Sequence, residues 1–77
     1  MLSAAQCRGA RAFLRWSQDD LANRSGVGKR TIAGFELGNY TPNTRTLNDL
    51  KRAFEDNGIT FLEPDESGSG VRFKYDT

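Results

Sequence analysis

The segment Ser17–Glu36 constrains the fold most, because it contains two helix starts separated by one short stretch. Ser17 and Asp20 have the spacing of a capping box, in which each residue satisfies a free backbone N–H of the other. We therefore expect a helix over about residues 18–24. Ser25-Gly26 then supplies the left-handed backbone that commonly ends a helix. The helix is therefore expected to be short.

A second helix is expected to begin directly after that turn. Val27 precedes Gly28, a tolerated N-cap residue, and has the spacing of a hydrophobic staple with Ile32. The helix should span about residues 29–37 and end at Gly38-Asn39. The segment therefore predicts two short helices joined by a turn that contains glycine.

Two further helices are expected to flank this pair. Ser3 and Gln6 repeat the capping-box spacing and begin a helix that reaches about Leu14. Asn43 caps a fourth helix over about residues 44–57. The residues expected in the shared core are Cys7, Ala10, Phe13, Leu14, Trp16, Ile32, Phe35, Leu47, Leu50, Ala53 and Phe54.

The spacing of apolar residues changes after Gly58 to the period of two that is typical of strands. The residues on the apolar faces of two expected strands are Ile59, Phe61, Val71, Phe73 and Tyr75. The polar segment EPDESGSG lies between the strands as a turn. We therefore predict a mainly α fold of four helices followed by a C-terminal β-hairpin. Residues 1–58 form the helical part, and residues 59–77 extend the same single domain.

Composition narrows the function classes. The 77 residues include no histidine and one cysteine, so a zinc site would need oxygen ligands alone. No apolar run reaches the roughly 18 residues that span a bilayer, and the N-terminal stretch lacks the features of a signal peptide. We expect a cytoplasmic protein that is not an enzyme and uses no metal, cofactor or small-molecule ligand.

Charge is divided unevenly along the chain, although the net charge is only +1. Residues 1–45 contain seven Lys/Arg and three acidic residues, whereas residues 46–77 contain four Lys/Arg and seven acidic residues. This division favours one basic surface that contacts phosphate groups.

The glycines near Lys29 do not fit a nucleotide site. In a P-loop, Gly28-Lys29 would be followed by Ser or Thr, but Arg30 follows, and the earlier glycine position holds Asn23. A dinucleotide fingerprint fails because Thr31 stands where the third glycine is required. The remaining interpretation is a helix-turn-helix, whose second helix enters the major groove of DNA.

Residues 14–59 resemble the phage repressor and Cro-type (Xre) helix-turn-helix family. The matching pattern is Ser17-Gln18, Leu21-Ala22, Gly26-Val27, Thr31-Ile32, Phe35-Glu36, Gly38, Pro42, Thr46-Leu47 and Gly58. The resemblance implies a Cro/repressor-like DNA-binding domain in which the helix over residues 29–37 is the recognition helix.

The resemblance also implies roles for individual residues. The positions expected to contact bases are Lys29, Arg30, Thr31 and Gly34. The positions expected to contact the DNA backbone are Ser17, Gln18, Gly28, Asn39, Tyr40, Thr41 and Arg45. Arg11 and Glu36 match a pair that joins the first and third helices in relatives. Tyr40 has a second interpretation, as an aromatic residue packed at the rim.

Two positions depart from the family pattern. Gly28 stands where relatives usually have Ser or Thr, so one hydroxyl that faces phosphate is missing. Gly34 stands where relatives usually have a long polar residue that contacts bases. Two interpretations of Gly34 remain open, namely closer approach of the helix to the groove and reduced base specificity.

These inferences predict a sequence-specific transcriptional regulator, most simply a repressor or autorepressor, that binds double-stranded DNA. One such module buries roughly 600–1,000 Å², and tight binding usually needs two, so we expect a homodimer on an inverted repeat. The dimer contacts are expected in the fourth helix and at the five apolar hairpin residues. The alternative is a protein that acts mainly through protein partners, as an antitoxin or anti-activator.

Overall fold

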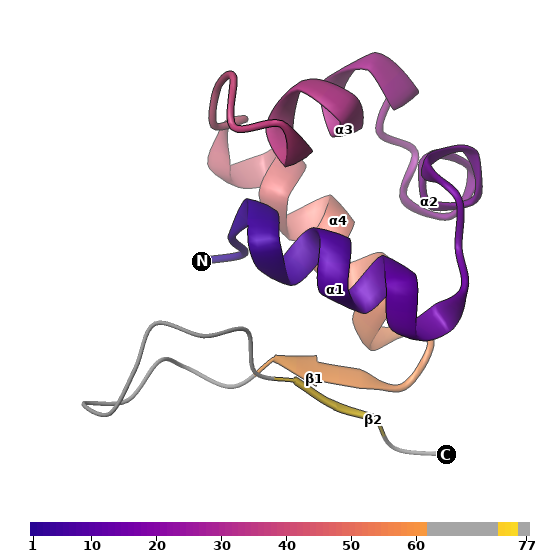
Figure 1. Ribbon diagram of the computed structural model, residues 1–77. Helices are drawn as coiled ribbons and strands as arrows, with labels where there is room; N and C mark the ends of the chain where they lie inside the picture. Colours follow the sequence, from indigo (N-terminus) through magenta and orange to yellow (C-terminus); the bar gives the residue numbers. More distant parts are fainter. Residues whose placement is uncertain (62–72, 76–77) are drawn as a thin grey trace.

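The computed structural model describes residues 1–61 and the backbone of residues 73–75. Within these residues, four helices are followed by a pair of strands (Figure 1). The helices are α1 (Ala4–Leu14), α2 (Gln18–Ser25), α3 (Lys29–Glu36) and α4 (Thr44–Glu55), and the strands are β1 (Ile59–Phe61) and β2 (Phe73–Tyr75). This order confirms the predicted mainly α fold with a C-terminal hairpin.

The predicted caps start three of the helices. The hydroxyl groups of Ser3 and Ser17 each accept a hydrogen bond from the backbone N–H of the third helical residue, and both starts form complete capping boxes. The side chain of Asn43 caps α4 in the same way. α3 begins at Gly28 without a side-chain cap, so its position depends on the preceding turn and on packing.

The helix ends depend on residues in the left-handed region of the backbone. Gly26 ends α2 with a φ of 77°, and Gly38 follows α3 with a φ of 81°. α4 ends at Glu55, before the expected residue 57. Its last turn tightens because the N–H groups of Asn57 and Gly58 bond to carbonyls three residues earlier in the chain.

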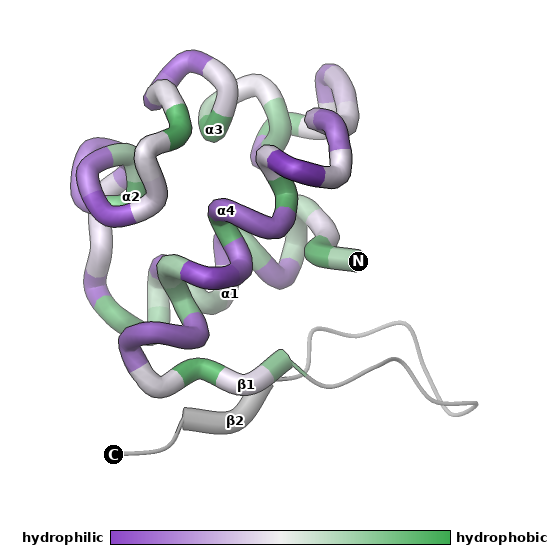
Figure 2. The backbone as a smooth tube through the Cα atoms, turned by 180° about the vertical axis from the view of Figure 1, so that it is seen from behind, coloured by the Kyte–Doolittle hydropathy of each residue, from purple (hydrophilic) through white to green (hydrophobic). Residues whose placement is uncertain are grey.

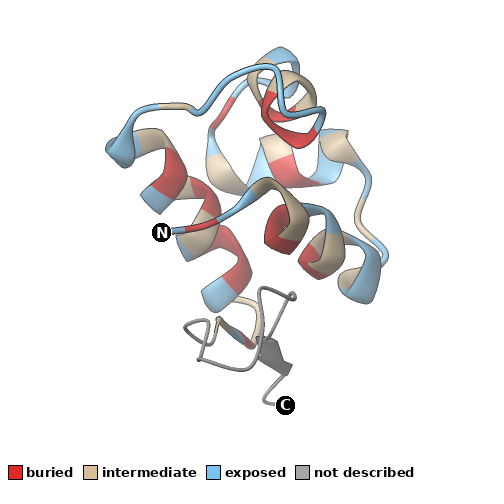
Figure 3. Ribbon diagram, turned by 60° about the vertical axis from the view of Figure 1, so that its left-hand side comes forward, coloured by how far each residue is buried: buried red, intermediate tan, exposed pale blue. Residues whose placement is uncertain are grey.

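The helices enclose one core. α2 packs on α3 and α4, and α1 packs on α3 and α4 from the other side (Figure 1). Buried residues line the inward sides of all four helices (Figure 3). The buried apolar residues are Leu2, Cys7, Ala10, Leu21, Val27, Ile32, Phe35, Leu47, Leu50, Ala53, Phe54 and Ile59. Most of the predicted core is therefore confirmed, with Leu14 and Trp16 half-buried at its edge.

Hydropathy follows this packing. Hydrophilic and hydrophobic residues alternate along α4, as expected for a helix with one buried side (Figure 2). Across the described part of the chain, no helix combines the length and the apolar character that crossing a membrane requires.

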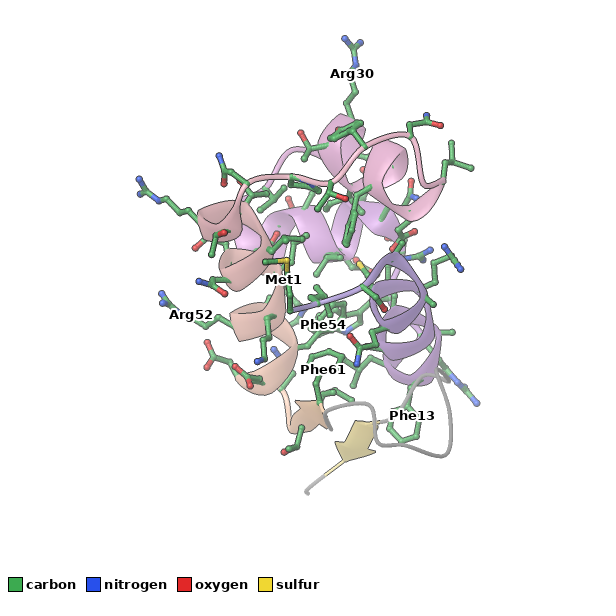
Figure 4. All side chains as sticks on the ribbon, turned by 90° about the vertical axis from the view of Figure 1, so that its left-hand side faces the viewer. Met1, Phe13, Arg30, Arg52, Phe54 and Phe61 are labelled. Carbon is green, nitrogen blue, oxygen red and sulfur yellow. The ribbon has the colours of Figure 1, made fainter. Side chains whose placement is uncertain are left out.

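Phe13 is an exception, because the expectation that it lies in the core is wrong. Its exposed fraction is 52%, and its ring lies below the end of α1 and outside the core (Figure 4). In an α-helix a residue six positions after Cys7 is rotated about 120° away from it. Phe13 therefore falls off the stripe that Cys7 and Ala10 place in the core.

An aromatic column joins the helices to β1. The rings of Trp16 and Phe54 stack with centroids 5.6 Å apart, and Phe61 meets Phe54 edge-on at 5.8 Å. The guanidinium of Arg24 lies 4.6 Å from the centroid of the Trp16 ring. The column fixes the start of the hairpin against the helical core.

The hairpin pairs β1 and β2 in antiparallel register, with Ile59 opposite Tyr75 and Phe61 opposite Phe73. It lies at the end of the molecule opposite α3 (Figures 1 and 2). Ile59 is only 1% exposed, so this residue of the expected dimer interface is used inside the chain's own core. Val71 and the EPDESGSG turn lie outside the described residues.

Candidate nucleic-acid interface

The turn between α2 and α3 consists of Gly26, Val27 and Gly28. The N–H of Gly26 bonds to the Ala22 carbonyl at 2.9 Å, which closes α2. Val27 is buried and holds the turn against the core. Gly28 is extended, and α3 begins at the next residue. The turn therefore leaves the first residues of α3 at the surface.

The outer side of α3 presents its basic residues to solvent. Lys29 and Arg30 are both exposed, and Arg30 extends away from the body of the protein (Figure 4). Gly34 follows Arg30 by four residues and therefore lies one turn further along the same side. Arg30 is thus the longest side chain projecting from the outer side of this helix.

Lys29 takes part in a weak ion pair with α2. Its Nζ lies 3.3 Å from Oδ2 of Asp19, and the two side chains are 57% and 68% exposed. Exposed pairs of this kind contribute about 0.2–1 kcal/mol. Lys29 can therefore leave Asp19 for another acceptor at little cost.

The inner side of α3 is fixed by buried residues. Ile32 is fully buried and Phe35 is 4% exposed. Glu36 is a buried carboxylate, with 4% of its side chain exposed. A buried charge is costly unless it is paired and hydrogen-bonded, so the partners of Glu36 decide whether this end of α3 is stable.

Glu36 is fully paired. Arg11 binds it through two parallel hydrogen bonds, from Nε to Oε2 at 3.0 Å and from NH2 to Oε1 at 2.9 Å. Gln18 donates from Nε2 to Oε1 at 3.0 Å, and the Cys7 thiol donates to Oε2 at 3.2 Å. Arg8 also donates to the Glu36 carbonyl. One carboxylate thus ties α1 and α2 to the end of α3.

Ionisation in this cluster follows from the same contacts. Burial alone would raise the pKa of Glu36, but hydrogen bonds from Arg11, Gln18 and Cys7 outweigh it and hold that pKa below its ordinary value. The hydrogen bond to Glu36 raises the pKa of Arg11. Burial raises the pKa of the Cys7 thiol, and the bond to Glu36 adds to the effect. At neutral pH the cluster therefore contains a carboxylate, a guanidinium and a protonated thiol.

Gln18 occupies the first position of α2, where the family resemblance implies a phosphate contact. Its side chain is bonded to Glu36, so the group directly available there is its backbone N–H. N–H groups in the first turn of a helix have no partner inside the helix, and the helix dipole favours an anion beside them. Ser17 uses its hydroxyl oxygen to cap this same helix.

The loop after α3 carries three further expected contact residues. Asn39, Tyr40 and Thr41 are exposed, and the N–H of Asn39 bonds to the Gly34 carbonyl at 3.0 Å. Arg45 is exposed in the first turn of α4. The loop therefore lies beside the outer side of α3, and its roles in DNA contact stay predictions.

Several contacts at this site were not expected from the sequence. Cys7 and Arg8 were not linked to Glu36, and Asp19 was not linked to Lys29. The four-residue spacing of Cys7 and Arg11 places both on one side of α1, which is the only local signal for the cluster. The resemblance placed Arg11 beside Glu36, and the structure shows this pair, but nothing in the sequence indicated that Cys7 and Arg8 also reach Glu36.

Two short helices joined by a three-residue turn, the second exposed at its start, define a helix-turn-helix domain. A helix-turn-helix family model matches residues 10–55, from within α1 to the end of α4. The chain therefore belongs to the Cro/repressor-type (Xre) helix-turn-helix family, whose domains bind DNA and serve regulation. A search of curated proteins finds no match to the chain.

Proposed function

We propose that this protein is a sequence-specific transcriptional regulator, most simply a repressor, that binds an operator through the outer side of α3. The main support is the exposed pair Lys29 and Arg30 at the start of a helix whose inner side is buried. Arg30 can donate two hydrogen bonds to O6 and N7 of guanine, and Lys29 can donate to the same acceptors. Such a regulator acts in the cytoplasm on the nucleoid.

Contacts to the DNA backbone are proposed for the segments that precede and follow α3. The start of α2 offers the free N–H of Gln18, and the loop at Asn39 and Thr41 offers polar groups near the other end of α3. Backbone contacts position a protein on the duplex, whereas base contacts specify the sequence.

We also propose a homodimer on an inverted repeat, with the two α3 helices roughly 34 Å apart. The hairpin lies opposite α3, so both α3 helices face one duplex only if the two copies pack side by side. The interface would therefore use α4 and an edge of the 59–77 extension. Sedimentation of the protein at micromolar concentration, free and on DNA, should show a dimer, and a monomer in both states would contradict it.

The operator function is tested with the DNA upstream of the protein's own gene. Binding is compared with scrambled DNA at two salt concentrations, because phosphate contacts alone give steep salt dependence without selectivity. The proposal predicts protection of a two-fold symmetric site with affinity at least roughly 10³ times that for scrambled DNA. If neither DNA binds, the proposal loses its main support.

The alternative is a domain that acts through protein partners. The acidic excess of residues 46–77 and the missing side chain at Gly34 favour it. Replacing Lys29 and Arg30 together by alanine distinguishes the two functions. The double variant should lose operator binding and regulation if α3 contacts bases, and should keep its activity if a protein partner is the target.

A further inference from the structure

The Tyr40 ring occupies the space in which a side chain at position 34 would lie. A Cβ atom built on Gly34 would lie 2.4 Å from Cε1 of Tyr40 and 3.0 Å from its Cζ and Oη. Carbon atoms do not approach one another that closely, so a side chain at position 34 and the ring at its present place exclude each other. The absence of a side chain at position 34 therefore makes room for the Tyr40 ring. Neither of the two interpretations of Gly34 drawn from the sequence included this reason for a glycine.

The hydroxyl group of Tyr40 is already used as a donor. It donates to the backbone carbonyl of Thr31 at 3.1 Å, one turn before Gly34. A phenol has one proton, so with this bond in place its oxygen can only accept. A phosphate oxygen also only accepts, and the two cannot form a hydrogen bond. The expected phosphate contact of the Tyr40 hydroxyl therefore conflicts with this geometry.

We propose that Tyr40 is a specificity-determining residue whose hydroxyl oxygen accepts a hydrogen bond from the exocyclic amino group of adenine or cytosine. These amino groups are donors that the major groove presents. The residue is 45% exposed, and its ring lies against Gly34, which is on the same side of α3 as Arg30 because four residues separate the two. Tyr40 thus supplies the contact that Gly34 lacks. The proposal rests on the proposed function, because it requires α3 to lie in the major groove.

Two hydroxyl deletions in the same loop test this role. Tyr40→Phe keeps the ring and removes the acceptor, and Thr41→Val is the matched control, because Thr41 is expected to contact phosphate. Wild type and both variants each select from a library of randomised DNA duplexes. Wild type should select adenine or cytosine at one position of each half-site, and Tyr40→Phe should lose that preference alone. Thr41→Val should weaken all sequences equally.

A second measurement uses the wild-type protein and altered DNA. The selected adenine is replaced by purine, or the selected cytosine by 2-pyrimidinone, which deletes only the amino group. Wild-type affinity should fall about five- to tenfold, the low end of the cost of a mismatched base pair, and Tyr40→Phe should be insensitive. Because wild type is used, this result does not depend on the folding of a variant.

Three results would overturn the proposal. If Tyr40→Phe weakened binding to all DNA sequences equally, the Tyr40 hydroxyl would be a phosphate contact. If Tyr40→Phe selected the same sequences as wild type but had a lower melting temperature, the Tyr40 hydroxyl would serve only the structural hydrogen bond to Thr31. If wild type selects no sequence at all, the proposed function itself fails. If Tyr40→Phe alone leaves the selected site unchanged, the proposed function survives and only the role of Tyr40 is lost.

Discussion

The two sides of α3 differ in almost every physical property. The inner side holds Ile32, Phe35 and Glu36, all buried, with the carboxylate bonded to α1 and α2. The outer side holds Lys29 and Arg30 in solvent, and the Tyr40 ring lies over Gly34. The inner side determines where the helix lies, whereas the outer side determines what it can bind.

This division means that stability and recognition can be changed separately. A change on the inner side should lower the free energy of unfolding without altering which DNA sequence the folded protein prefers. A change on the outer side should alter DNA preference and leave stability within about 0.5 kcal/mol, as for most surface substitutions.

The largest effect is expected for Ile32→Ala. Ile32 is fully buried, and truncations of this kind cost about 2–5 kcal/mol because a cavity remains. Urea unfolding measures the loss. In the absence of urea and at low temperature, the folded fraction of Ile32→Ala should select the same DNA sites as wild type. A changed site preference would show that the inner side also takes part in recognition.

A somewhat smaller loss, about 2–3 kcal/mol, is expected for Glu36→Ala. Removing one partner of a buried pair leaves the other uncompensated, and the usual cost is reduced here because 22% of the Arg11 side chain is exposed. Adding Arg11→Met should recover part of the loss, because the unpaired charge is removed while the aliphatic stem is retained. Equal or greater instability of the double variant would contradict this account.

An effect of about 2 kcal/mol on binding, or roughly 30-fold in affinity, is expected for Arg30→Ala on the selected operator. The affinity for scrambled DNA should change much less, because phosphate contacts elsewhere are retained. Fluorescence anisotropy at one fixed salt concentration gives both values. Equal losses on the two DNAs would make Arg30 a phosphate contact.

Acid should weaken the inner side of α3. The pKa of Glu36 in the folded protein lies below its ordinary value, because the hydrogen bonds outweigh burial. Its contribution is therefore complete at neutral pH and is lost as pH falls from about 4.5 through the folded pKa. In urea unfolding at several pH values, Glu36→Gln should show a smaller loss between pH 5 and pH 3 than wild type. Equal losses would assign the acid sensitivity to other carboxylates.

The smallest effect is expected for Asp19→Asn. It releases Lys29 from an exposed ion pair and removes a negative charge next to the expected DNA surface, so affinity should rise about two- to threefold. Stability should fall by less than about 0.5 kcal/mol, because an acid is lost from the first turn of α2. Glu55→Gln makes the same change of charge far from α3, and an equal gain there would indicate net charge alone.

Local features of this fold were predictable from the sequence. The caps at Ser3, Ser17 and Asn43 and the turn at Gly26 depend on neighbouring residues, and each lies where it was expected. Phe13 is the exception, because six residues of α-helix rotate it about 120° away from Cys7 and so out of the core.

Contacts between segments could not be predicted in the same way. The Tyr40 ring meets Gly34 only because the loop folds back on α3, and the Cys7 thiol reaches Glu36 only because α1 packs on α3. The sequence indicated an unusual glycine at position 34, but its physical cause is a residue beyond the end of that helix.

The most direct test of the division between the two sides is sequence selection by wild type and by the Lys29→Ala, Arg30→Ala double variant. Both proteins are first shown to have the same unfolding free energy within about 0.5 kcal/mol. The account predicts that wild type selects a two-fold symmetric site and that the folded double variant selects none. Selection of the same site by the double variant would contradict the claim that the outer side of α3 determines DNA recognition.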